Sequence, residues 1–448
     1  MDSFHFCIAL RTQSDDRHQL AIAYPNPKPH AGYLISICGR SNQIRRRWDV
    51  DVQNKSIGKC PLCNHSQVVD GFAIANAPVT VASVFSAAEE ARTVPTGQIQ
   101  LACCTRCGFV FNRAFDPDLA KLGAKYESSQ RTSPHFSAFA RELAKEWVDR
   151  YGLRGGHVIE VGCGDGAFLA ELLQAGVTSV TGIDPLAQSN LVPTEHSAQA
   201  QFRKHNFTAD DARLPANALV CRHTLEHIPN VAEFMKLLRL WSEHNPDSPI
   251  LIEVPAADRI FAEGAFWDIY YEHCNYFTLA SLRHAFESAG LCVKHLKLAY
   301  DGQYILLDSE GRVPAIAWGS ALAEDTLYTF SRFSASSHEV VERCRSRLLS
   351  LAGEGGPVVL WQGAAKTVGF MTAIGGDIPL AGAVDLNPMR QSQYLPPSGL
   401  RVLIPDELVN IGPRHIVLMN PVYKSEVQVK LDAMGVETSL HTIDQLLS

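Results

Sequence analysis

The sequence has no uncharged apolar stretch near the roughly 18 residues that a membrane-spanning helix needs. Its first residues, MDSFHFCIALRTQSDDRH, lack the basic-then-apolar order of a secretory signal. It also lacks an excess of basic residues, since the formal net charge is −7 at pH 7, which argues against nucleic acid as the main partner. We therefore expect a cytoplasmic protein that acts on a small molecule, without a membrane or nucleic-acid partner. No residue pattern specifies an oligomeric state.

The length and composition are those of an ordinary folded protein with more than one domain. A chain of 448 residues has room for two or three domains, and 46% hydrophobic and 19% charged residues are usual for a soluble protein. Residues 1–55 contain a proline-rich turn, YPNPKPH, and the basic run Arg45 to Arg47. We expect this segment to be a solvated or poorly ordered extension, with a phosphate-binding arm as the alternative.

The 12 cysteines include two pairs whose spacing is typical of a metal site. Cys60 and Cys63 form one Cys-x-x-Cys turn, Cys104 and Cys107 form another, and residues 64–103 lie between them as a folded insert. Two such turns supply the four thiolates of a tetrahedral zinc site. Since four thiolates fill the coordination sphere, the predicted zinc is structural. Free thiols or a disulfide pair are the alternatives, and a reducing cytosol disfavours disulfides. We expect a zinc-binding module over residues 56–125.

The strongest functional signal is a glycine turn after a short apolar strand, in HVIEVGCGDGAFL. Gly162, Gly164 and Gly166 alternate with other residues, so the backbone can approach a ligand closely. Gly162, Gly164 and Ala167 also fit the spacing of a dinucleotide-binding turn, which leaves a nicotinamide cofactor open. Glu160, directly before the turn, favours another ligand, because a carboxylate would repel a pyrophosphate but suit an ammonium group.

Strands and helices alternate through residues 126–310, which predicts a mainly parallel sheet covered on both faces. Ligands bind at the carboxyl ends of such strands. There, Asp184 is placed to bind ribose hydroxyls, and Asn206 and Phe207 to contact adenine. The segment CRHTLEHIPN, which contains His223, resembles a loop that lines the cofactor pocket in many methyltransferases, with helix capping or packing as the alternative for His223. The expected elements are a helix from Ser133 onward, strands 158–161, 180–183, 219–221 and 250–254, and helices 167–174 and 231–244.

A cluster of phenolic and titratable residues follows in AFWDIYYEHCNYFTL. Such a cluster past the carboxyl edge of a sheet is typical of a site that moves protons, although a packing segment with a buried ion pair has the same composition. The C-terminal residues 315–448 then repeat the layout of a strand, a small-residue turn and a helix, in PVVLWQGAAKTVGFMTAI. This repetition predicts a second α/β, Rossmann-like domain.

The Glu-x-Gly-x-Gly-x-Gly motif resembles the first motif of class I S-adenosylmethionine-dependent methyltransferases. Zinc knuckles, that motif, Tyr-x-Glu-His-x-x-Tyr-Phe and a second α/β unit together resemble the zinc-containing nucleotide-sugar C-methyltransferases over about residues 56–448. The resemblance implies a central Rossmann-like methyltransferase sheet, S-adenosylmethionine and one structural Zn²⁺ as cofactors, and a nucleotide-linked keto-deoxysugar as substrate. In that family a base removes the proton beside a ketone, and the enolate attacks the methyl group.

Carried over by motif position, His273 is the base, and Glu272 and Tyr270 orient it or stabilise the enolate. The resemblance also implies that Tyr126 approaches the sugar and that the C-terminal domain holds the sugar nucleotide, with Lys366 near phosphate. Tyr276, Asn420 and Tyr423 are the remaining expected substrate contacts. The turn Gln362 to Thr367 departs from the family in having fewer glycines, which restricts the approach of a diphosphate. A structural brace is the alternative role for this domain.

Two other functions fit parts of the sequence. The first is a methyltransferase that acts on an oxygen or nitrogen of another small metabolite, for which no enolate is needed. The second is a nicotinamide-binding or non-catalytic protein whose zinc module mediates assembly. Glu160 separates the second from the methyltransferases, because its charge matters for a cationic amino group and little for a nicotinamide.

Overall fold

The computed structural model describes residues 57–120, 132–319, 321–375 and 378–447, all within the unit of residues 46–448. The expected extension at residues 1–55 and Tyr126 lie outside the described residues. The strands of the described segments form sheets of four, seven and six strands. Among these residues no helix is long and apolar enough to cross a membrane.

The seven-stranded sheet confirms the predicted parallel arrangement, with strand order β10-β11-β8-β7-β4-β5-β6. Five strands are parallel, and β10 and β11 form an antiparallel hairpin at one edge. Val161 pairs with both Ile183 and Cys221, so the ends of three strands are level and their loops meet. The strands are β4 (His157–Val161), β5 (Ser179–Ile183), β6 (Ala200–Arg203), β7 (Ala218–Arg222), β8 (Ile250–Pro255), β10 (Leu291–Ala299) and β11 (Tyr304–Arg312).

Helices flank this sheet, and the predicted ones form where their signals place them. The Ser133 side chain accepts a hydrogen bond from the Phe136 N–H, and Pro134 occupies the first turn, so the first helix begins there. Its buried face includes Trp147, whose ring N–H donates to Asp308 on β11 at 3.1 Å. The helices are α2 (Pro134–Arg150), α3 (Ala167–Gln174), α4 (Val231–His244), α5 (Ala257–Glu263) and α6 (Leu279–Ser288).

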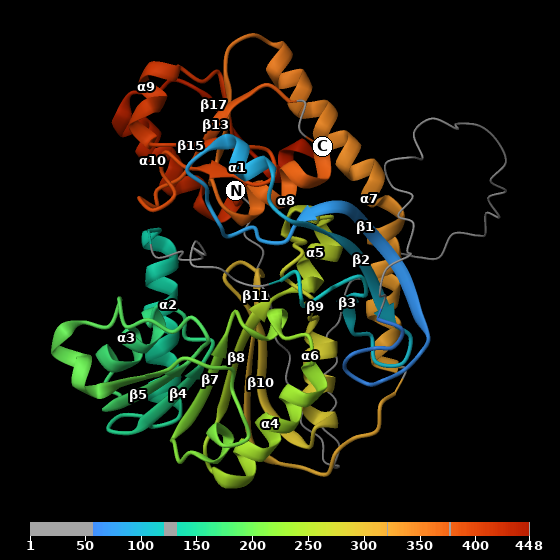
Figure 1. Ribbon diagram of the computed structural model, residues 1–448, viewed down its shortest axis with the longest axis vertical. Coiled ribbons are helices and arrows are strands. Elements are labelled where there is room, and N and C mark those ends of the chain that lie inside the picture. Colours follow the sequence, from blue (N-terminus) through green and yellow to red (C-terminus); the bar gives the residue numbers. More distant parts are fainter. Residues whose placement is uncertain (1–56, 121–131, 320, 376–377, 448) are drawn as a thin grey trace, which may run out of the picture. The chain divides into compact units, whose positions relative to one another are not determined.

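The four-stranded sheet is antiparallel and has the order β1-β2-β3-β9. Figure 1 shows β1 and β2 as a long curved pair. The edge strand β9 comes from a much later segment, and Tyr276 on it pairs with Val110 on β3. This pairing anchors the segment that carries His273 to the cysteine-containing module. The elements are β1 (Val68–Pro78), α1 (Ala88–Arg92), β2 (Thr96–Cys104), β3 (Val110–Asn112) and β9 (Asn275–Tyr276).

The six-stranded sheet has the order β14-β15-β13-β12-β16-β17 and is parallel except for the β14–β15 pair. It follows a helix of 33 residues, α7, which the sequence analysis did not predict and which packs on β1 and α5. The strands are β12 (Val358–Trp361), β13 (Leu380–Val384), β14 (Tyr394–Leu395), β15 (Leu400–Leu403), β16 (His415–Leu418) and β17 (Ser439–Thr442). The helices are α7 (Ala321–Gly353), α8 (Ala365–Ile374), α9 (Leu408–Ile411) and α10 (Lys424–Met434).

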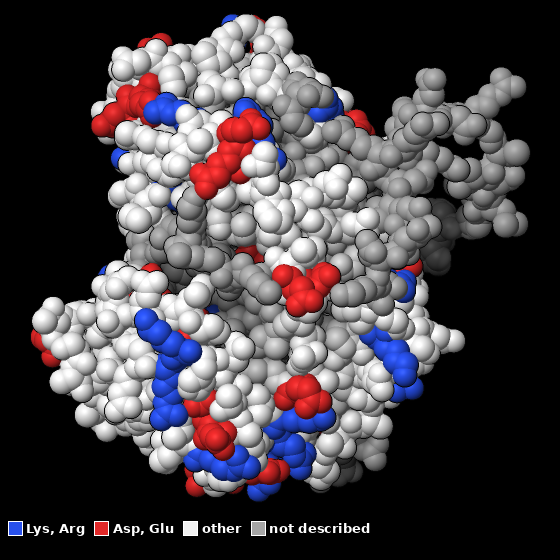
Figure 2. Space-filling model, in the orientation of Figure 1, with Lys and Arg blue, Asp and Glu red and all other residues white. Residues whose placement is uncertain are grey.

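The charged side chains of the described residues are interspersed on the face shown in Figure 2. Red acidic groups lie beside blue basic ones on this face. Several ion pairs of the described residues join side chains one helical turn apart, such as Arg239 with Glu243.

Candidate active site

The glycine turn after β4 has the backbone geometry that its sequence predicts. Gly162, Gly164 and Gly166 have φ angles of 78°, 52° and 82°, a region that residues with a Cβ rarely occupy. A Cβ on Gly162 would lie 1.8 Å from Thr224 Oγ1, whereas one on Gly164 would meet nothing within 4 Å. The first glycine thus permits close packing, and the second leaves backbone accessible to a ligand.

Asp184, at the end of β5, closes the other side of this turn. Its Oδ2 accepts a hydrogen bond from the Gly164 N–H at 3.2 Å, and its Oδ1 accepts one from the Leu186 N–H. Of the two expected adenine contacts, Asn206 is exposed, whereas Phe207 is buried and packs on Phe234. Only Asn206 is therefore fully open to a ligand in this conformation.

Glu160 is a buried carboxylate behind the turn, with 3% of its surface exposed. Its Oε2 has no hydrogen-bond partner among the described residues. Burial raises the pKa of Glu160 to about 8; Arg222 opposes this rise, and the carboxylates of Asp165 and Asp184 add to it. A cation bound at this point would return Glu160 to its charged form, so the carboxylate suits the ammonium group of an amino acid.

Asp211 supports the loop after β6, and the sequence analysis missed it. Burial acts against its charge, but hydrogen bonds from Thr208 and the ion pair with Arg203 at 2.9 Å hold the pKa of Asp211 below its usual value. Thr208 donates to the carboxylate through both its hydroxyl and its N–H. The spacing Thr-x-x-Asp is typical of such side-chain capping, and it was the available signal.

The loop after β7 carries His223, which has a φ of 47°. Its Nε2 lies 2.9 Å from Glu253 Oε1 on β8, and its ring packs on Tyr304 with centroids 4.7 Å apart. Arg222 donates to the other oxygen of Glu253 at 2.6 Å. Although Glu253 is buried, Arg222 and His223 lower its pKa to about 2, so the carboxylate stays charged and fixes the loop.

His273 lies between two other rings in the phenolic cluster. Its centroid is 4.9 Å from that of Tyr270 and 4.7 Å from that of His227, which belongs to the short helix η4 (Leu225–His227). Burial, with contributions from His227 and His223, lowers the pKa of His273 well below its usual value. The imidazole is therefore neutral near pH 7 and has a lone pair.

Tyr270 is held by a group of charged side chains of which Asp268 is buried and the others are half-buried. Its hydroxyl donates to Asp268 Oδ1 at 3.0 Å, and Asp268 also forms ion pairs with Arg259 and Lys366. Lys366 lies in the first turn of α8, which packs closely here, since a Cβ on Gly369 would lie 2.7 Å from the Trp267 carbonyl oxygen. The ammonium group expected near phosphate is thus paired with a carboxylate two residues before Tyr270.

Glu272 and Tyr276 lie on either side of His273 in the sequence. The side chains of both form hydrogen bonds with backbone groups. The Glu272 carboxylate accepts hydrogen bonds from the Val81 and Ala82 N–H groups. The Tyr276 hydroxyl accepts from the Tyr270 N–H and donates to the Tyr270 carbonyl, each at 3.1 Å. These contacts fix the segment around His273 from both sides.

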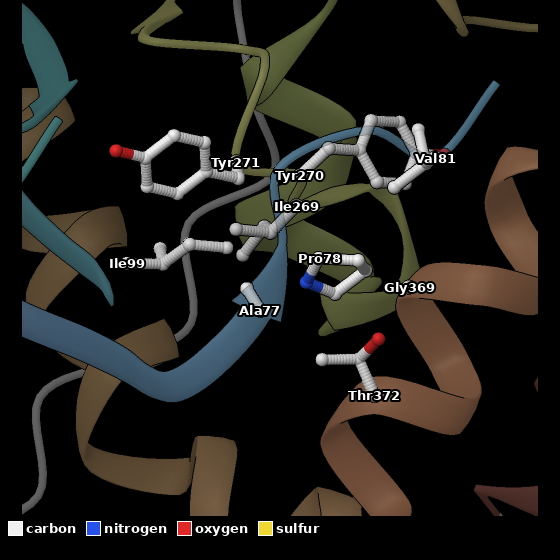
Figure 3. Close-up of a pocket in the computed structure, with 9 residues that line it drawn as sticks. All are labelled: Ala77, Pro78, Val81, Ile99, Ile269, Tyr270, Tyr271, Gly369 and Thr372. Atoms are coloured by element: carbon white, nitrogen blue, oxygen red, sulfur yellow. The ribbon is translucent and has the colours of Figure 1, made fainter. Parts of the chain in front are cut away.

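An apolar pocket lies on the other side of Tyr270 (Figure 3). Residues of β1, β2 and α8 line it together with the segment that follows the short helix η5 (Phe266–Asp268). Gly369 and Thr372 supply the α8 side, and Ile269 and Tyr271 the opposite one. The Tyr270 ring therefore borders a small apolar space, and Gly369 of α8 lies close to it.

Asn420 and Tyr423, the other expected substrate contacts, bind the β10–β11 turn. Asn420 and Gln303 are buried and exchange two amide hydrogen bonds, of 2.9 and 3.1 Å. The Tyr300 hydroxyl donates to that of Tyr423 at 2.8 Å. Nearby, Gln362 in the turn after β12 has a φ of 98°, a value that favours glycine.

The four cysteines come together as their spacing predicts. Their sulfur atoms all lie within 4.8 Å of one another, with 3.7 Å between Cys60 and Cys107 and 3.5 Å between Cys63 and Cys104. The two turns are alike, because Asn64 and Gly108 each follow the second cysteine with a positive φ and donate an N–H to the first cysteine's carbonyl. A tetrahedral zinc ion with Zn–S distances of about 2.3 Å needs sulfurs roughly 3.8 Å apart, so the donors fit.

Comparison with known proteins bears on this geometry. A family described as "Methyltransferase domain" matches residues 136–296, which include the glycine turn, Asp184 and His273. The chain is also 25% identical over 396 residues to the C-methyltransferase NovU of Streptomyces niveus, covering 83% of this chain and 92% of NovU. The protein is a class I S-adenosylmethionine-dependent methyltransferase.

Other relatives match this methyltransferase over shorter regions. A ubiquinone biosynthesis O-methyltransferase of Pseudomonas fluorescens is 34% identical over 101 residues, covering 21% of this chain and 43% of the relative. The crystal structure of a 1,6-didemethyltoxoflavin-N1-methyltransferase from Burkholderia thailandensis is similar over 46% of this chain and 96% of that chain, with 12% identity. Its TM-score of 0.32 is too low to support the assignment.

Proposed function

We propose that this methyltransferase methylates the carbon beside a ketone in a nucleotide-linked keto-deoxysugar or a related ketone. The observation that carries the proposal is the environment of His273, a neutral, half-buried imidazole beside Tyr270 and His227. An oxygen or nitrogen acceptor has its own lone pair, whereas a carbon acceptor needs a base to create one. A half-buried histidine with an available lone pair meets that need.

The proposed chemistry begins when His273 removes the proton from the carbon beside the ketone, which leaves the electron pair in an enolate. S-adenosylmethionine supplies an electrophilic methyl group on a positively charged sulfur. The new carbon–carbon bond forms as the methyl–sulfur bond breaks, and that electron pair stays on sulfur. Donors that approach the developing oxyanion stabilise it, and burial keeps out water that would reprotonate the enolate.

Other residues position the two reactants. Glu160 receives the amino group of the methyl donor, Gly162, Gly164 and Gly166 let it lie against the turn, and Asp184 binds its ribose. His223, Asn206 and Phe207 complete this pocket in the proposal. Tyr270 and Glu272 hold His273 in place, and Tyr126 approaches the sugar.

Transfer to carbon is supported by the extent of the similarity to NovU, a C-methyltransferase, which runs through 92% of that protein, whereas the sugar-nucleotide substrate rests on the motif resemblance alone. We accordingly assign residues 56–125 to zinc binding, 126–310 to methyl transfer and 315–448 to the sugar nucleotide. In the last segment the proposed contacts are Asn420, Tyr423 and Lys366, together with Tyr276 from the central one. Their present partners are other side chains or backbone, so substrate would have to share or replace those partners.

O-methylation is the second candidate, because the O-methyltransferase of Pseudomonas fluorescens has the higher identity, 34%. That similarity covers only 21% of this chain. A shared cofactor-binding region would produce it whichever atom accepts the methyl group. We also propose that Cys60, Cys63, Cys104 and Cys107 hold one structural Zn²⁺, as their sulfur spacing supports.

Hydrogen exchange tests the base directly. In D₂O with S-adenosylhomocysteine in place of the methyl donor, the wild-type protein should exchange the proton beside the ketone of a nucleotide-linked 4-keto sugar. His273→Ala should slow that exchange by about 10² to 10⁴-fold, whereas His295→Ala, on an exposed part of β10, should not. Exchange at the wild-type rate in His273→Ala would remove His273 from this role.

A further inference from the structure

The proposed base and two side chains beside it carry the kinds of donor atom that bind a metal. Glu226, His227 and His273 each offer one ligand atom, and these atoms all lie within 4.8 Å of one another. They come from two segments, η4 after β7 and the segment before β9. Two imidazoles and one carboxylate are a frequent ligand set for Zn²⁺, Co²⁺ and Fe²⁺.

Glu226 gives the strongest indication that a cation belongs here. The residue is 2% exposed, and its Oε2 has no hydrogen-bond partner among the described residues. Its other oxygen, Oε1, lies 3.8 Å from the Nδ1 of His223. A buried carboxylate oxygen without a partner is costly unless an ion or hydrogen bond compensates it.

His227 has the orientation of a metal ligand. Its Nδ1 donates to the Glu272 backbone carbonyl at 3.0 Å, so its Nε2 keeps the lone pair. Histidines that bind metals usually donate their other N–H to a carbonyl or carboxylate in this way, which fixes the ring and the tautomer. The His273 ring stands at 85° to that of His227.

The three donors also face one another without bonding directly. In the described part of the chain no hydrogen bond joins the Glu226 carboxylate to either ring, although the ligand atoms are within 4.8 Å. If the Glu226 carboxylate were hydrogen-bonded to one of the imidazoles, the two groups would lie closer together. An ion with ligand distances of about 2.0–2.2 Å would bridge it after small side-chain movements.

We propose that Glu226, His227 and His273 bind one divalent transition-metal ion and that this ion inhibits methyl transfer. The inhibition rests on the proposed function, because a lone pair of His273 that coordinates a metal cannot accept the proton of a substrate. The protein would then respond to free metal ions through the base itself, while the zinc among the four cysteines stays structural.

Cobalt titration of the full chain, with zinc already in the cysteine site, tests the binding. We expect one Co²⁺ per chain with the weak visible absorption of nitrogen and oxygen ligands and without the strong near-ultraviolet band of cobalt–thiolate bonds. Glu226→Gln, which keeps the shape and removes the charge, should weaken this binding at least tenfold, and His227→Gln should act likewise. Glu243→Gln and His295→Ala, at exposed or partly exposed positions, should leave it unchanged.

Turnover measurements test the consequence. Co²⁺ should inhibit methyl transfer at the concentration at which it binds, a chelator should restore activity, and Glu226→Gln should raise the half-inhibiting concentration at least tenfold. Absence of the cobalt spectrum, an unchanged spectrum in Glu226→Gln, or binding without inhibition would each overturn the proposal. Absorption needs no turnover, so a failure to methylate keto sugars would refute the proposed function without affecting the binding result.

Discussion

At the scale of single residues, Glu160 shows how burial sets the charge of the carboxylate behind the glycine turn. Its pKa of about 8 lies above the ordinary value of 4.5, so the folded state binds a proton that the unfolded state has lost between these values. The contribution of Glu160 to the free energy of unfolding should therefore be fully present below about pH 4.5. It should fall as the pH rises towards 8, by up to about 1.4 kcal/mol per pH unit. Glu160→Gln should flatten this dependence, measured by urea unfolding at several pH values.

The same residue gives a test of the cofactor. Glu160→Gln removes the negative charge that would pair with the amino group of S-adenosylmethionine, so affinity should fall about 10- to 100-fold. Binding to the wild type near pH 7 should also release protons, because the ammonium group favours the ionised carboxylate. Calorimetry in buffers of different ionisation enthalpy measures both effects. Unchanged affinity and no proton release would show that Glu160 does not face the amino group.

Kinetics separates two roles for Lys366, which are to position Tyr270 through Asp268 or to bind substrate phosphate. The structure pairs it with Asp268, which holds the Tyr270 hydroxyl, so Lys366→Met should lower kcat and alter its pH profile, with partial rescue in Lys366→Arg. If Lys366 instead binds substrate phosphate, Lys366→Met should mainly raise KM. Lys424→Met, at an exposed position on α10, is the control for loss of a lysine.

At the scale of elements, we predict that zinc holds the two cysteine knuckles and the β1–β2 sheet together. Structural zinc contributes on the order of 10 kcal/mol to folding, so its removal should unfold this module. Metal analysis should find about one zinc per chain, and Cys60→Ser or Cys107→Ser should give poorly soluble protein. Cys292→Ser, on β10 and away from the knuckles, should behave like the wild type. A well-folded metal-free protein would contradict the zinc assignment.

The sequence predicts elements well where a pattern is local. The glycine turn, the helix that starts near Ser133 and the two Cys-x-x-Cys turns depend on neighbouring residues, and the structure has them as expected. Helix α7 was missed although its buried positions Phe330, Phe333, Val341, Cys344, Leu348 and Leu351 have helical spacing. Serines between these positions interrupt the apolar pattern, so the helix was not recognised in the sequence.

At the scale of the whole molecule, the contacts that build the candidate site join distant segments. Lys366 reaches Asp268, Glu272 reaches Val81, and Asn420 reaches Gln303. No local pattern encodes these partners, because each depends on how separate sheets pack. The sequence could therefore name Lys366 and Asn420 as chemically suitable residues without revealing which groups they contact.

The central claim is that this methyltransferase forms a carbon–carbon bond. The most direct measurement is incubation with S-adenosylmethionine carrying ¹³C in its methyl group, against a panel of nucleotide-linked 4-keto sugars, followed by NMR. We predict a new signal in the carbon-bound methyl region with at least one sugar. A signal in the oxygen-bound region, or none across the panel while S-adenosylmethionine binds, would contradict the claim.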